Sequence, residues 1–279
     1  MSEGNFEHTL RTPDDRTIRF YDSGPQTGPT RTVIWQHGTP QTGRLLEPLL
    51  ADAAQRGIRL VSCARAGYPG SSARRGRTVT SSAADVIAVA DALGLAGFAT
   101  MGASGGGPHA LGCAALAPDR VRGVVTLAGI APFTEDFDWF AGMVSPGGLR
   151  AARRGRAARA RFAETAQFDQ NSFIEADWRA LADDWAPLGS DAERAAGDGP
   201  DGEIDDDVAF TTPWGFALAE VQVPVLVVQG GLDRIVPPAH ARWMTEQLPH
   251  GELWLKPRDG HISVLGACPV AFDWLADIA

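Results

Sequence analysis

Three side chains of this sequence, Ser104, Asp233 and His261, are of the types that together carry out nucleophilic catalysis. A serine hydroxyl becomes a strong nucleophile when a histidine accepts its proton, and a carboxylate holds that histidine in the required tautomer. Such a triad splits an acyl bond in two steps, through an acyl-enzyme. The three residues can act only if the surrounding elements bring them together.

Ser104 lies within the segment Gly102-Ala103-Ser104-Gly105-Gly106, which matches the G-x-S-x-G pattern of a nucleophile elbow. In that motif the serine occupies a sharp, strained turn between a strand and a helix, and glycines flank it because larger side chains would collide. Residues 98–101 predict a short strand, and residues 105–117 predict a helix. We therefore expect the hydroxyl to stand above a sheet, beside helix N–H groups that stabilise negative charge.

The segment His37-Gly38-Thr39-Pro40 follows a strand predicted over residues 32–35. A loop at this place can offer a backbone N–H to the negatively charged oxygen of a tetrahedral intermediate. The N–H groups of Thr39 and Gly105 are the two predicted donors of this oxyanion hole. We expect His37 to orient the loop through hydrogen bonds rather than to act as the catalytic base.

Asp233 and His261 each follow a predicted strand. Asp233 comes after the apolar run of residues 224–229, where its carboxylate can accept the imidazole N–H. His261 lies after a strand at 252–255, on a loop that can reach back over the sheet as a general base must. A different acid remains open, because acidic residues also follow the strand predicted over residues 121–127. These are Glu135, Asp136 and Asp138.

The elements that would position these residues alternate between strands and helices along most of the chain. This alternation predicts an α/β fold with a parallel sheet covered by helices on both faces. Helices are expected over residues 42–56, 80–93, 105–117, 238–248 and 265–277. Residues 133–220 contain no confident strand, so we predict a helical cap there. The core domain then comprises residues 1–132 and 221–279.

With these motifs in this order, the chain resembles the α/β-hydrolase superfamily from about residue 15 to its end. It is most similar to the capped branch that includes proline iminopeptidase-like, esterase-like and meta-cleavage-product hydrolases. The resemblance implies an eight-stranded, mostly parallel sheet with the cap inserted after the sixth strand. Two departures stand out, since Ala64 replaces the aspartate usual before the loop of residues 65–71, and the elbow lacks the tryptophan common in proline iminopeptidases.

A serine nucleophile in this setting predicts an enzyme that cleaves a small carboxylic ester, lactone or thioester, with the cap selecting the substrate. The alternatives on the same triad are a C–C bond hydrolase and an aminopeptidase. A third is a catalytically silent ligand-binding protein. The aromatic side chains predicted to bind substrate are Phe133, Phe137, Trp139, Trp185 and Trp214.

The bulk composition limits the classes of molecule that the protein is expected to bind. A net charge of −9 and a pI near 5.1 argue against nucleic acid and, less strongly, against an anionic membrane. Three cysteines without metal-type spacing, and a polar amino terminus without a signal-peptide pattern, predict a cytoplasmic protein. We expect a small-molecule substrate and no metal or organic cofactor, and a homodimer stays open.

Two charged runs lie within the predicted cap. Arginines gather between residues 150 and 161, and acidic residues gather between residues 198 and 207. We interpret the arginines as a solvated helix face that the acidic run balances, with attraction of an anionic substrate as the alternative.

Overall fold

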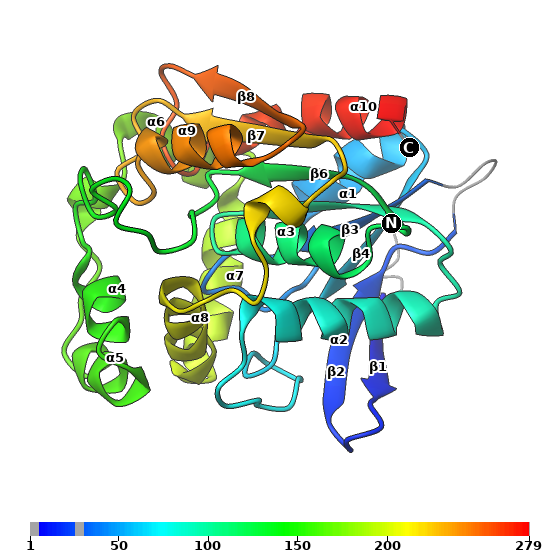
Figure 1. Ribbon diagram of the computed structural model, residues 1–279, viewed down its shortest axis with the longest axis horizontal. Coiled ribbons are helices and arrows are strands. Elements are labelled where there is room, and N and C mark those ends of the chain that lie inside the picture. The colour runs from blue at the N-terminus through cyan, green and yellow to red at the C-terminus, as the bar shows by residue number, and fades with distance from the viewer. Residues whose placement is uncertain (1–5, 26–30, 279) are drawn as a thin grey trace.

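An eight-stranded sheet forms the centre of the protein in the computed structural model (Figure 1), which describes residues 6–25 and 31–278. The amino-terminal residues 1–5, where the sequence shows no signal-peptide pattern, lie outside the described residues. The strand order is β1-β2-β4-β3-β5-β6-β7-β8. The strands are Glu7–Arg11 (β1), Thr17–Asp22 (β2), Arg31–Gln36 (β3), Ile58–Cys63 (β4), Phe98–Ala103 (β5), Val121–Leu127 (β6), Val225–Gly230 (β7) and Gly251–Lys256 (β8).

Strands β3 to β8 pair in parallel, whereas β2 pairs antiparallel with both β1 and β4. Helices cover both faces. One face packs on α2 (Val79–Ala92), α3 (Gly106–Leu116) and α9 (Pro238–Gln247), and the other packs on α1 (Glu47–Gln55) and α10 (Cys268–Ile278). Every residue of β5 and β7 is buried, as expected for strands covered on both sides. The fold class predicted from the sequence is confirmed.

The chain between β6 and β7 leaves the sheet and forms a helical insertion, on the left of Figure 1. Within residues 133–220, all of which the structure describes, there is no strand. The insertion contains α4 (Gly147–Ala152), α5 (Arg156–Ala163), a 3-10 turn (Gln170–Ser172), α6 (Glu175–Ala182), α7 (Ala186–Gly197), α8 (Asp201–Thr211) and a second 3-10 turn (Leu218–Glu220).

Two helices begin later than the sequence pattern predicts. Helix α1 starts at Glu47 rather than near residue 42, and the backbone N–H and the hydroxyl of Thr42 donate to Asp191 of α7. Helix α10 starts at Cys268, after a 3-10 turn over Ser263–Ala267 whose first residue also binds the insertion, at Asp177. In both cases a residue just before the helix contacts the insertion.

The parallel register brings four loops to one edge of the sheet. Gln36 pairs with Gly102, Ala103 pairs with Leu127, and Gly230 pairs with Lys256. The loops after β3, β5, β7 and β8 therefore leave the sheet from the same edge. In sheets of this kind, ligands bind outside the carboxyl ends of the strands.

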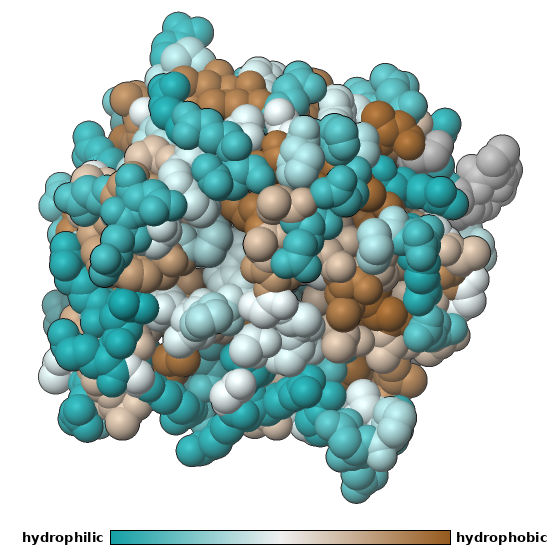
Figure 2. Space-filling model, viewed as in Figure 1, coloured by the Kyte–Doolittle hydropathy of each residue, from teal (hydrophilic) through white to brown (hydrophobic). Residues whose placement is uncertain are grey.

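The face of the molecule in Figure 2 is mostly hydrophilic, and its hydrophobic residues form separate patches. No helix within the described part of the chain is both long and apolar enough to cross a bilayer.

Truncation of a core side chain at the centre of the sheet should destabilise the fold. We expect Leu60→Ala in β4, which removes a fully buried side chain, to lower the free energy of unfolding by about 2–5 kcal/mol. The matched control is Leu116→Ala at the end of α3, where the leucine is 44% exposed and a change within about 0.5 kcal/mol is expected. Urea denaturation measures both, and equal losses would contradict the assigned core.

Candidate active site

Ser104 occupies the turn between β5 and α3. Its φ of 52° is a left-handed conformation that residues other than glycine rarely adopt, and its backbone N–H donates to the carbonyl of Leu127 at 2.8 Å. The side chain is half-buried. Backbone strain of this kind persists only where the surroundings hold it in place, and it is common at functional sites.

The glycines on either side are required by close backbone approach. A Cβ built on Gly102 would collide with the carbonyl oxygen of Gly106, and one built on Gly106 would collide with that of Gln36. Glycine at these positions thus lets the helix start directly against β3 and β5. The steric argument made from the sequence for this turn matches the geometry.

The loops bring His261 between Ser104 and Asp233. The imidazole Nε2 lies 2.9 Å from Ser104 Oγ, and Nδ1 lies 2.8 Å from Asp233 Oδ2. Asp233 is fully buried, and its other oxygen accepts the backbone N–H groups of Ile235 and Val236 at 2.9 Å each. These bonds fix the carboxylate so that it can orient the imidazole.

The acids left open in the sequence do not reach this histidine. Glu135, Asp136 and Asp138 are all exposed on the segment after β6, and Asp138 accepts a hydrogen bond from the N–H of Phe140. The position of Asp233 thus distinguishes it from the three alternatives.

Two opposing effects act on His261. Burial alone lowers its pKa, because the charged imidazolium loses hydration, but the adjacent Asp233 carboxylate and the more distant Asp177 raise the pKa above the ordinary 6.5. An arrangement of this kind can stabilise an imidazolium, the form that a histidine takes when it accepts a proton from a serine hydroxyl.

Asp177, on α6 of the insertion, holds the histidine loop. Its buried carboxylate accepts the backbone N–H groups of His261, Ile262 and Ser263 at 3.2, 2.9 and 2.8 Å, together with the Ser263 hydroxyl at 2.8 Å. A Cβ on Gly260 would collide with this carboxylate. The sequence offered no signal for this role, because an aspartate in the first turn of a helix is common.

The loop after β3 is held by His37 and Arg65. The backbone N–H of Arg65 donates to His37 Nε2 at 3.1 Å, so the imidazole proton is on Nδ1, which donates to the Gly38 carbonyl at 2.7 Å. Burial keeps the pKa of His37 well below its ordinary value, with the charge of Arg65 acting in the same direction, so the ring is neutral. His37 lies in this loop and not against Ser104.

The two residues predicted to supply the oxyanion donors, Thr39 and Gly105, lie next to each other. A Cβ on Gly105 would collide with the Thr39 hydroxyl and would lie 2.8 Å from Phe210 Cζ. Within the described residues, neither the Thr39 nor the Gly105 N–H donates to a protein acceptor. Phe210, on α8, was not anticipated from the sequence, and it is the aromatic side chain that this contact places beside the elbow.

The predicted substrate-binding aromatics fall into two groups. Phe133, Phe137 and Trp139 line a surface cavity of about 340 Å³, which Ser104 does not line. Trp185 and Trp214 are buried, and the Trp214 indole donates to the Phe210 carbonyl. Trp139 is also buried, and its indole donates to the carbonyls of Ala131 and Pro132. A substrate-binding role for all five stays a prediction.

No group of three or more histidine, cysteine, aspartate or glutamate side chains within residues 6–25 and 31–278 is arranged to hold a metal ion.

The sequence of this chain is similar to those of known proteins. Residues 31–267 match the sequence profile of the family described as alpha/beta hydrolase fold. A non-heme chloroperoxidase from Streptomyces lividans is 28% identical in an alignment of 274 positions, which spans 89% of this chain and 95% of that protein.

Two solved structures illustrate the similarity. An esterase from Thermogutta terrifontis superposes with a TM-score of 0.72 at 20% identity, covering 98% of each chain. An enol-lactonase from Burkholderia xenovorans superposes with a TM-score of 0.71 at 18% identity, covering 97% of this chain and 99% of the other. At these identities the superpositions show a shared fold alone.

The elbow should not tolerate a methyl group. We expect Gly106→Ala to lower the free energy of unfolding by about 1–3 kcal/mol, because the new Cβ forces backbone shifts against Gln36. The control is Gly189→Ala in α7, where no atom lies within 4 Å of the added carbon and a gain of about 0.5–1 kcal/mol is expected. Thermal unfolding of both variants is the measurement, and a stable Gly106→Ala protein would refute the close packing.

If His261 acts as a base, its titration should appear in the pH dependence of turnover. The neutral imidazole is the active form, so kcat/KM should rise with pH through a midpoint above 6.5. In Asp233→Asn, burial remains but the carboxylate is gone, so the midpoint should fall below 6.5 and kcat should drop by roughly 10³–10⁴-fold.

The control for this profile is Glu135→Gln, which neutralises an exposed carboxylate after β6. It should leave the midpoint where it is in the wild type. If the midpoint stays the same in Asp233→Asn, Asp233 does not raise the pKa of the titrating group, and the prediction is wrong.

Proposed function

Since the chain belongs to the alpha/beta hydrolase family, we propose that it is a serine hydrolase that cleaves a small carboxylic ester through an acyl-enzyme on Ser104. The observation that carries the proposal is the hydrogen-bonded series from Ser104 through His261 to Asp233. Its geometry is that of a nucleophile, a base within reach of it and an acid that orients the base.

In the proposed reaction, His261 Nε2 takes the proton of Ser104 as Oγ attacks the acyl carbon. The N–H groups of Thr39 and Gly105 stabilise the negative oxygen of the tetrahedral intermediate, and removal of one such donor typically costs about 10²–10³-fold in rate. His261 then gives the proton to the departing alcohol. Water, deprotonated by the same histidine, attacks the acyl carbon and releases the acid and the free serine.

We propose residues 133–220 as the cap that selects the substrate. Support comes from Phe210 of α8, which lies against Gly105 and therefore beside the predicted oxyanion hole. An apolar ring there favours a substrate with an apolar acyl group, because apolar contact near the reacting centre orients the ester without competing hydrogen bonds.

The substrate that we propose is an ester or a lactone, and structural neighbours named as an esterase and an enol-lactonase share the fold on which this proposal is made. The similarity to a non-heme chloroperoxidase favours a second reaction, in which hydrogen peroxide replaces water. Attack of peroxide on the acyl-serine would release a peracid and regenerate Ser104. A C–C bond hydrolase, an aminopeptidase and a silent binding protein are the remaining alternatives.

Location and assembly are also proposals. Cys63, Cys113 and Cys268 are free and buried, which is compatible with a reducing cytoplasm. The partner that we propose is a small-molecule substrate, and a homodimer is left to direct measurement.

The test of the proposed function is hydrolysis of a p-nitrophenyl ester series, from acetyl to octanoyl. Wild type should show an optimum chain length, and Ser104→Ala should lose at least about 10³-fold in kcat, because it lacks the nucleophile. The control Ser190→Ala changes an exposed serine of α7 and should match wild type.

Each result discriminates among the candidates. Full activity in Ser104→Ala would overturn the assignment of the nucleophile. A wild type that hydrolyses none of these esters would exclude the simple esterase and favour the amide, C–C or binding alternatives. Peracid formed from an ester and hydrogen peroxide would support the second reaction.

A further inference from the structure

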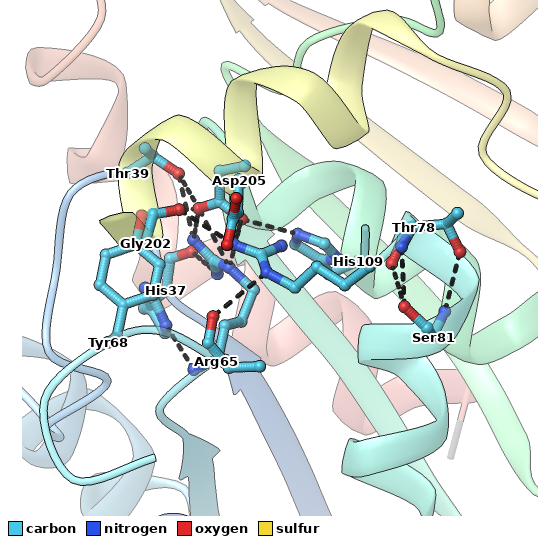
Figure 3. A network of polar contacts seen from close by, with 12 residues as sticks. His37, Thr39, Arg65, Tyr68, Thr78, Ser81, His109, Gly202 and Asp205 are labelled. Atoms are coloured by element: carbon cyan, nitrogen blue, oxygen red, sulfur yellow. Dashed lines mark hydrogen bonds and ion pairs between the residues drawn. The ribbon is translucent and has the colours of Figure 1, made fainter. Parts of the chain in front are cut away.

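A fully buried carboxylate, Asp206 of α8, joins the insertion to the loop after β3. Figure 3 shows the surrounding network of polar contacts, in which Thr39, Arg65 and Tyr68 are gathered. Its Oδ2 accepts hydrogen bonds from the Thr39 hydroxyl at 2.6 Å, the Tyr68 hydroxyl at 2.7 Å and Arg65 Nη2 at 2.6 Å. Its Oδ1 lies 2.6 Å from Arg77 Nη2 and accepts from Arg65 Nε at 3.1 Å. The triad does not use any of these groups.

The Asp206 carboxylate at the centre of this network stays ionised. Burial opposes ionisation of Asp206, yet Arg65 and Arg77 beside it hold its pKa well below the ordinary value. Taking such charges out of water is costly, and apolar residues often join two segments at least as well as a buried ion pair. Joining the two segments does not by itself require such a network.

Arg65 transmits the constraint from Asp206 to the backbone of the loop. Its Nη1 donates to the His37 carbonyl at 2.5 Å, and its Nη2 donates to the Gly38 carbonyl at 3.1 Å. The Gly38 carbonyl also accepts from His37 Nδ1. In a planar trans peptide the C=O and the N–H point in opposite directions. With the Gly38 carbonyl held by two donors, the N–H of Thr39 is directed away from them.

We propose that Asp206 is a positioning residue for the oxyanion hole: it holds Arg65 and the Thr39 hydroxyl, and through them it sets the direction of the Thr39 N–H. The proposal rests on the proposed function, and it makes one helix of the insertion part of the catalytic apparatus. Asp206 contacts none of the reacting groups, so its effect is on the geometry of the donor. A misplacement of about 1 Å in such a site can cost about 10²-fold in rate.

A matched pair of variants separates positioning from packing. Thr39→Val and Tyr68→Phe each remove one hydroxyl donor from the same oxygen, Asp206 Oδ2, at nearly the same distance. The first removes the direct bond from the loop after β3 to Asp206, together with the bond from Arg65 Nη2 to the Thr39 hydroxyl, and keeps the Thr39 N–H. The second leaves both of these bonds intact.

In ester hydrolysis we expect Thr39→Val to lower kcat by about 10-fold with KM within about threefold, because the Thr39 N–H that the lost hydroxyl bonds position acts in the transition state. Tyr68→Phe should stay within about twofold of wild type in both constants. Thr39→Ser, which keeps the hydroxyl, should restore kcat. Equal losses in Thr39→Val and Tyr68→Phe would overturn the proposal.

Asp206→Asn tests the carboxylate itself. Where this variant folds, kcat should fall by about 10²-fold, with the pH midpoint of His261 unchanged, because Asp177 holds the histidine loop separately. A shifted midpoint would show that Asp206 acts on the base and would overturn the assignment. If Asp206→Asn does not fold, the Thr39→Val and Tyr68→Phe pair decides.

Amide hydrogen exchange distinguishes failure of this inference from failure of the proposed function. A wild type without esterase activity would remove the proposed function, but the exchange of residues 37–43 would still report the link to Asp206. We expect faster exchange there in Thr39→Val than in Tyr68→Phe, with residues 260–263 unchanged in both. Identical exchange of residues 37–43 in the two variants would refute the link.

Discussion

Burial of carboxylates at the contact between the helical insertion and the sheet edge is the constraint on which this structure depends. Asp177, Asp191 and Asp206 come from three successive helices, and each is buried against a loop that leaves the sheet. An ionised carboxylate cannot stay in such a place without donors on its oxygens. The donors that the loops supply therefore link the arrangement of the loops to that of the insertion.

The elbow shows the same dependence at short range. Ser104 has a left-handed backbone that the chain would not adopt alone, and the bond from its N–H to the Leu127 carbonyl of β6 helps to hold it. Gly102 and Gly106 allow the backbones of β5, α3 and β3 to approach one another. The hydroxyl thus has a fixed position relative to the sheet, and His261 and Asp233 reach it from loops at the same edge.

Much of this site was predictable because its signals are local or periodic. The strand, glycine turn and helix around Ser104 are contiguous, and the apolar runs before Asp233 and His261 are typical of buried parallel strands. Parallel strands must share their carboxyl edge, so the order of the motifs already brought the three residues to one side. The path of the loop after β7 decided that Asp233, rather than an acid at 135, 136 or 138, contacts His261.

The sequence by itself determined the α/β fold and the nucleophile elbow, because hydrophobic period and glycine spacing act within a few residues. Only the tertiary structure decided the partners of Asp177 and Asp206. The acidic run that contains Asp206 is indistinguishable in sequence from a solvated surface, and its partner Arg65 lies 141 residues away. The arginine run pairs with it in the same way, since Arg159 is buried against Glu203 and Asp207. Whether a carboxylate is solvated or buried depends on which distant donors surround it, and that is fixed when the insertion packs on the sheet.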